Sequence, residues 1–67
     1  MKISVRNRLN GKITDVKKSA TAAHVRIDVG GTTVTASITN EAVDELALKA
    51  GDEAFAVIKA SDVMVGK

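Results

Sequence analysis

The sequence has no cysteine and no proline, and its only aromatic residue is Phe55. Without cysteine the chain forms no disulfide and offers no thiolate to a metal ion. The single histidine, His24, rules out a histidine-rich metal site within one chain. We therefore expect no residue to act as a direct metal ligand. The chain also lacks a cysteine nucleophile and has little material to build a cleft. We therefore expect that the protein is not an enzyme.

The scarcity of aromatic residues bears on nucleic-acid binding. A small β domain that binds single-stranded nucleic acid normally stacks bases on several aromatic side chains. Phe55 alone does not provide such a surface, and its place inside an apolar run indicates a core residue. Basic residues nevertheless crowd the first third of the chain. A single-stranded nucleic-acid-binding module therefore remains an alternative function.

Long hydrophobic stretches are also missing. The longest uninterrupted apolar run, 54–58, is far too short to span a membrane. The first seven residues alternate between polar and apolar types and lack the hydrophobic block of a signal peptide. We expect a soluble, cytoplasmic protein with no membrane partner.

The chain length of 67 residues allows one domain, spanning 1–67. A domain this small buries only about 60% of the surface that its unfolded chain exposes. Small proteins usually compensate with disulfides, a metal ion or partner subunits. Since the first two are missing, we expect a homo-oligomer.

Apolar residues make up 45% of the chain, and β-branched residues occur throughout it, which predicts a mainly β protein. A change of apolar parity between Ile13 and Val16 predicts a β-bulge, and Gly30-Gly31 predicts a two-residue hairpin turn. Alternation and turn signals predict strands at 3–7, 11–18, 23–29, 32–39, 53–59 and 63–65.

A short helix is predicted between the fourth and fifth of these strands, with Asn40 as its N-cap and Gly51 as its end. Its apolar face would contain Ala42, Val43, Leu46 and Ala47. Strand 53–59 is apolar on both faces, so it should be central or covered by another subunit. Met64 should pack in the core. This order of elements favours an OB-like, five-stranded Greek-key barrel with one short helix.

Three polar clusters lie at the ends of predicted elements. They are Ser4-Val5-Arg6-Asn7, Thr39-Asn40-Glu41 and Lys59-Ala60-Ser61-Asp62. Hydroxyls, cationic side chains and free backbone amides at such ends suit an anion. The alternative interpretation is that these are solvated turn and cap residues.

Two of these clusters begin and end a pattern that resembles a known family. Ser4-Val5-Arg6-Asn7, followed by Leu9 and Gly11-Lys12-Ile13, resembles the Ser-Ala-Arg-Asn…Gly-Lys opening of the molbindins, also called Mop domains. Residues 56–65, Ala-Val-Ile-Lys-Ala-Ser-Asp-Val-Met-Val, resemble their closing segment. The resemblance covers essentially the whole chain. Val5 departs from it, since the family favours alanine there.

The resemblance implies an OB-like barrel that assembles as a hexamer, a trimer of dimers, with molybdate or tungstate between subunits. No organic cofactor is implied. By similarity, the oxyanion would be bound by Ser4, Val5, Arg6, Asn7, Lys59, Ala60 and Ser61, with Thr39 supplied by a neighbouring subunit. A free-standing domain of this kind would store or buffer the anion.

Simple chemistry agrees with this implication. Molybdate and tungstate are tetrahedral dianions whose oxygens only accept hydrogen bonds, and a site of amides, hydroxyls and a lysine supplies donors. Three hypotheses remain open: an oxyanion binder, an OB-fold nucleic-acid-binding module and a purely structural assembly module.

Overall fold

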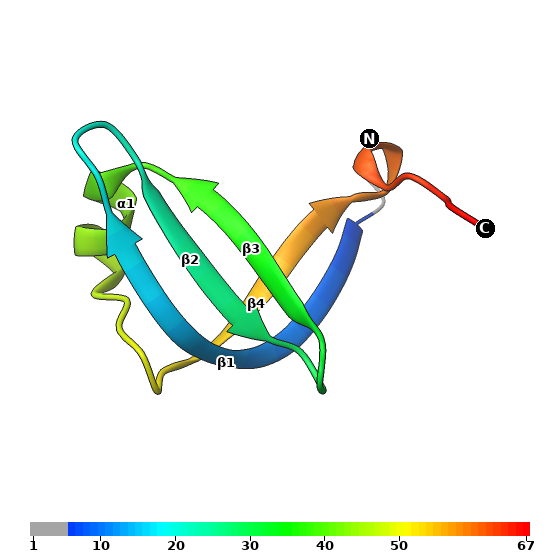
Figure 1. Cartoon of the computed structure of the whole chain (residues 1–67), viewed down its shortest axis with the longest axis horizontal. Coiled ribbons are helices and arrows are strands. Elements are labelled where there is room, and N and C mark those ends of the chain that lie inside the picture. The colour runs from blue at the N-terminus through cyan, green and yellow to red at the C-terminus, as the bar shows by residue number, and fades with distance from the viewer. Residues whose placement is uncertain (1–5) are drawn as a thin grey trace, which may run out of the picture.

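The computed structural model describes residues 6–67, which form a curled antiparallel sheet with one short helix (Figure 1). The chain is therefore mainly β, as the sequence predicts. The elements are, in order, β1 (Arg6–Lys18), β2 (Ala23–Asp28), β3 (Thr33–Ile38), α1 (Asn40–Leu46), β4 (Glu53–Lys59) and the single 3₁₀ turn η1 (Ala60–Asp62).

The sheet has the strand order β3-β2-β1-β4, and β1 is the strand that connects its two parts. The first half of β1 pairs with β4, from Arg6 opposite Lys59 to Lys12 opposite Glu53. From Lys12 onward β1 pairs with β2 instead. β1 therefore bends strongly, and β4 leaves the rest of the sheet together with the first half of β1 (Figure 1). We call this two-stranded extension, residues 6–12 and 53–59, the arm.

The prediction of two separate strands, at 3–7 and 11–18, is wrong for the residues that the structure describes. Residues 6–18 form one strand, because the ladder with β4 keeps the intervening residues extended. Residues 3–5 of the first predicted strand lie outside the described part.

The last predicted strand, 63–65, is also wrong, and the described residues form four strands rather than the five of the predicted barrel. Met64 is 93% exposed and Val65 95%, so Met64 is not a core residue either. After η1 the chain runs away from the sheet, and no strand of residues 6–67 pairs with it (Figure 1). The described sheet is open, with β3 and β4 as its edges, and Greek-key closure of a barrel stays a prediction.

The predicted bulge and hairpin turn are confirmed. The β1–β2 register shifts between Ile13 and Asp15, which places the extra residue where the parity changes. Gly30 and Gly31 both have positive φ, at 90° and 94°, as a tight turn between twisted strands requires. The turn closes with the amide of Val29 donating to the carbonyl of Thr32 at 2.8 Å.

The helix begins one residue earlier than predicted. Thr39, not Asn40, is the N-cap, and its hydroxyl oxygen accepts from the amide of Ala42 at 3.0 Å. The side-chain amide of Asn40 instead donates to the carbonyl of Ser19 at 2.9 Å, which ties the start of α1 to the turn after β1.

The helix also ends earlier than predicted, at the left-handed residue Ala47 rather than at Gly51. Leu46, predicted on the buried apolar face, is 66% exposed and borders the open groove on the concave side of the sheet. Leu48, beyond the helix, packs against the core instead.

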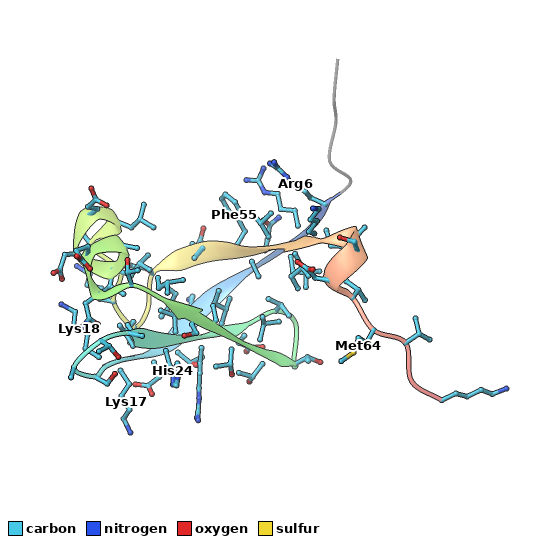
Figure 2. All side chains as sticks on the ribbon, turned by 90° about the horizontal axis from the view of Figure 1, so that it is seen from above. Arg6, Lys17, Lys18, His24, Phe55 and Met64 are labelled. Carbon is cyan, nitrogen blue, oxygen red and sulfur yellow. The ribbon has the colours of Figure 1, made fainter. Side chains whose placement is uncertain are left out.

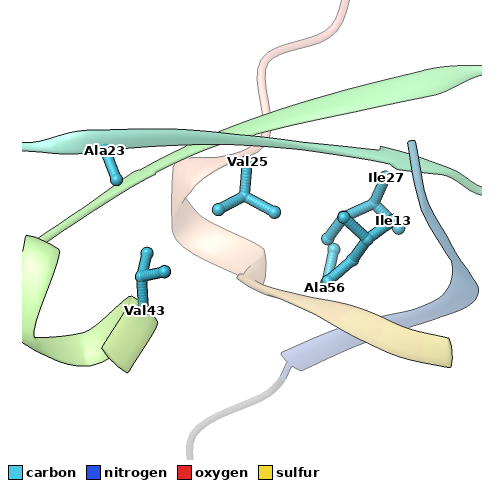
Figure 3. Packing of buried hydrophobic residues seen from close by; sticks show 6 residues of the cluster. All are labelled: Ile13, Ala23, Val25, Ile27, Val43 and Ala56. Carbon is cyan, nitrogen blue, oxygen red and sulfur yellow. The ribbon is translucent and has the colours of Figure 1, made fainter. Parts of the chain in front are cut away.

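The core lies between the concave face of the sheet and α1 (Figure 3). β2 alternates strictly between buried and exposed residues. β4 is an edge strand, so the prediction of a central strand is wrong. Phe55 is not a core residue, because it lies on the outward face of β4 and is 48% exposed. The buried residues are Ile13, Ala23, Val25, Ile27, Val43 and Ala56.

Gly11 occupies the bend at which β1 leaves β4 and meets the end of β2. A Cβ atom there would lie 2.1 Å from the carbonyl oxygen of Asp28, which is backbone and does not move aside easily. We expect Gly11→Ala to lower the free energy of unfolding by about 1–3 kcal/mol, as overpacked sites do. Urea denaturation at fixed protein concentration measures this, with Gly66→Ala as the control, since a Cβ at Gly66 meets nothing within 4 Å. Equal stability of the two variants would contradict the account.

Candidate anion-binding site

The free end of the arm brings together five of the predicted site residues. Arg6 lies directly opposite Lys59 in the β1–β4 ladder, and Asn7 lies opposite Ile58. The chain then enters η1 through Ala60 and Ser61. The opening and closing segments of the sequence, more than fifty positions apart, therefore meet at this end. Ser4 and Val5 were also predicted here and lie outside the described residues.

The backbone at η1 provides local donors. Lys59 occupies the N-cap position with extended backbone angles, and no side chain caps the turn. The first amides of a helical turn have no partner within the turn, so they are free to donate to a bound group. Ser61 adds an exposed hydroxyl beside them.

The side chains of Arg6 and Asn7 in the opening segment have different surroundings. Neighbouring residues of a strand point to opposite faces, so Arg6 and Asn7 do not share a face. The side-chain amide of Asn7 donates to the carbonyl of Ile58 at 3.4 Å, a long hydrogen bond between the two arm strands. The Asn7 side chain therefore contacts the partner strand of the arm, whereas Arg6 shares its face with Lys59.

This end of the arm is strongly cationic. Arg6 and Lys59 are directly opposed, and Arg8 lies on the same face two residues further along β1. The ion pair found among residues 6–67 joins Lys18 to Asp44 at the other end of the molecule, so none of these three cations has a carboxylate partner there. Like charges that face each other across a ladder destabilise it. A bound anion would remove that repulsion.

The sequence analysis did not single out Arg8 as a candidate, although it lies on the same face as Arg6 and Lys59. The signal for it was present, because Arg6 and Arg8 are two residues apart in a strand and must share a face. Its guanidinium carbon lies 3.8 Å from the centre of the Phe55 ring.

Thr39 does not join the other predicted residues within one chain. It precedes α1, whereas Lys59 leads into η1, and these two elements lie at opposite ends of the molecule (Figure 1). Thr39 is exposed, and its hydroxyl oxygen already caps α1.

The concave side of the sheet contains a groove of about 680 Å³ between β3 and β4. It is lined mainly by apolar side chains, among them Val34 and Ile38 of β3 and Ala54 and Ile58 of β4. Such a lining offers few donors to an anion, so the groove is not the candidate site. Among the described residues no three His, Cys, Asp or Glu side chains gather as a metal site would require, and no helix there is long and apolar enough to cross a membrane.

Comparison with known proteins finds similar proteins that are named for binding molybdenum-pterin or molybdate. The "Probable molybdenum-pterin-binding protein" of Haemophilus influenzae is 49% identical over 67 residues, which cover 98% of this chain and 97% of that protein. A molybdate-binding protein from Sporomusa ovata superposes with a TM-score of 0.91 at 37% identity over the full length of both chains. The molybdate-bound structure of the cytoplasmic protein ModG gives a TM-score of 0.86 at 45% identity, covering 96% of this chain and 46% of that one.

The family comparison gives the same result over nearly the whole sequence. The TOBE domain model matches residues 3–65. This span includes both segments on which the molbindin resemblance depends, and the relatives cover nearly the whole chain. The chain therefore belongs to the TOBE domain family, as a member of its molbindin, or Mop, group.

Proposed function

We propose that this protein binds molybdate or tungstate at the end of the arm and stores or buffers the anion. The observation that carries the proposal is the opposition of Arg6 and Lys59 beside the uncapped turn η1. Relatives described as binding molybdate share the fold and more than a third of the sequence. In the proposed site, Ser4, Arg6, Lys59 and Ser61 donate through side chains, and Val5 and Ala60 donate through backbone amides.

The donor set suits this class of ligand. A tetrahedral dianion has four oxygens that accept hydrogen bonds and none that donates. Hydrogen bonds from cationic and amide donors to a charged acceptor are among the stronger ones in proteins. Asn7 supports the site indirectly, through its hydrogen bond across the arm to the carbonyl of Ile58.

We place the complete site between subunits, with Thr39 supplied by a neighbouring copy. Two features of the single chain support an assembly. Its radius of gyration is 13.0 Å, whereas a compact domain of this length is expected near 11 Å. Its apolar groove between β3 and β4 is open, and Phe55 and Val57 on the outer face of β4 are about half exposed. A second copy would cover such surfaces, and we propose the hexamer, a trimer of dimers, that the family resemblance implies.

The proposed role is passive and requires no reaction. The relatives are described as binding proteins, and the proposed site consists of donors without a nucleophile and base pair. We propose that the anion is bound without an organic cofactor. A cytoplasmic location is supported by the relative ModG, which is described as cytoplasmic.

Nucleic-acid binding is the second candidate, and one observation favours it. Phe55 is exposed beside Arg8 on the cationic face of the arm, so a base would find one stacking surface and nearby charges. A mobility shift with single-stranded DNA that weakens steeply with salt would support this alternative. Retention of molybdate through purification would support the oxyanion binder and argue against a purely structural module.

The oligomer proposal predicts that no folded monomer exists at micromolar concentrations. An open groove and an unsupported arm leave one chain too little buried apolar surface for stability. Light scattering should give the mass of a symmetric assembly, with the hexamer expected. A monodisperse, folded species with the 7.0 kDa mass of one chain would refute it.

Replacement of Lys59 should weaken binding sharply. Lys59→Ala removes a charge-assisted hydrogen bond, which should cost about 2–3 kcal/mol of molybdate affinity in calorimetric titration. The matched control is Lys17→Ala, because Lys17 is an exposed lysine in the distal part of β1 and contributes only screened attraction. Equal losses in the two variants would remove Lys59 from the site.

The donor set also predicts selectivity among anions. Phosphate near pH 7 carries at least one O–H group, which needs an acceptor that the proposed site lacks. The mismatch should cost about 1–3 kcal/mol, or roughly tenfold to a hundredfold in affinity. Sulfate is fully ionised but smaller, so it should bind more weakly than molybdate and more tightly than phosphate. Competition titrations at constant ionic strength test this order, and phosphate that displaces molybdate as readily as sulfate does would disprove it.

A further inference from the structure

Arg8 is an exposed cation that the fold holds in place. Its guanidinium carbon lies 3.8 Å above the centre of the Phe55 ring, which is the distance of a stacked contact. A guanidinium over an aromatic face is attracted electrostatically, and stacking keeps its planar set of donors in one orientation. Most exposed arginines move freely, so this contact lowers the entropy that Arg8 would lose on binding a ligand.

Arg8 belongs to the same face of the arm as the proposed site. In the β1–β4 ladder Arg6 faces Lys59 and Arg8 faces Val57, two residues further along. Same-face neighbours along a strand are about 7 Å apart, so Arg8 lies one step from the opposed pair. Arg6 and Phe55 project from the same side of the arm in Figure 2, which is the side on which Arg8 stacks.

None of the three cations forms an ion pair within the described residues. The ion pair found in residues 6–67 uses Lys18 and Asp44, and no side-chain hydrogen bond found there involves Arg6, Arg8 or Lys59. Three adjacent positive charges attract an anion in proportion to its charge. The benefit of the third cation is therefore larger for a dianion than for a monoanion of the same shape.

We propose that Arg8, oriented by Phe55, is a further anion-binding residue that makes the site prefer doubly charged over singly charged oxyanions. This inference rests on the proposed function, since it assigns a residue to that same site. Phe55 acts through Arg8 and is a positioning residue.

Molybdate and perrhenate provide the test, because both are tetrahedral ions with four oxygens and they carry charges of −2 and −1. Calorimetric titration of the assembled protein with each ion gives two dissociation constants. Arg8→Gln should weaken molybdate binding about fivefold to tenfold and perrhenate binding about twofold to threefold, so the preference for molybdate falls about twofold to threefold. The matched control, Arg26→Gln, removes an exposed arginine of β2 outside the arm and should leave both constants unchanged.

Two further variants separate charge from structure. Arg8→Lys keeps the charge but loses the planar stack, and its preference should lie between those of wild type and Arg8→Gln. Phe55→Leu should reduce molybdate affinity in wild type and should cause no additional loss in the Arg8→Gln background, because the ring acts through Arg8. Urea unfolding of each variant monitors the fold.

The possible outcomes are distinguishable. Equal molybdate-to-perrhenate ratios in Arg8→Gln and Arg26→Gln would overturn the role of Arg8 and leave the proposed function intact. An equal loss of both ions in Arg8→Gln would overturn it as well, because a structural defect does not discriminate by charge. Absence of molybdate binding in wild type would refute the proposed function and the inference together.

Discussion

The structure depends on one strand that serves two partners. β1 pairs with β4 through its first half and with β2 through its second, and Lys12 faces a residue of each. Among the strands of residues 6–67, β1 alone pairs both within the arm and with the rest of the sheet. The change of partner requires a bend, and Gly11 permits it because the carbonyl of Asp28 occupies the space of a side chain. The position of the candidate site follows from this geometry.

The arm places stability and binding in opposition. Its free end faces Arg6 with Lys59 and adds Arg8 nearby, an arrangement that repels itself in the absence of an anion. Backbone pairing along the whole arm and the stack of Arg8 on Phe55 offset that repulsion. A protein that used these residues only for folding would gain by replacing one cation with a carboxylate. The charge arrangement is thus better explained by a bound anion than by the stability of the fold.

The same open geometry explains why the single chain buries little of its apolar surface. Six of the described residues form the buried core, while about half or more of Phe55, Val57 and Leu46 is exposed. The tail is exposed too, at Val63, Met64 and Val65. Exposed apolar residues of this number in so small a protein favour association with further copies, because burial of apolar surface is the main source of stability.

The sequence by itself determined the β class, the bulge after Ile13, the Gly30-Gly31 turn, the helix and the family, because local backbone preference and side-chain alternation are properties of neighbouring residues. It also indicated both polar segments of the candidate site. Only the tertiary structure decided that 6–18 is one strand, that Phe55 and the tail are exposed, that Arg8 stacks on Phe55, and that Thr39 lies at the other end of the molecule from Lys59. These facts depend on which distant segment pairs with β1, and contacts between distant segments leave no mark on local periodicity.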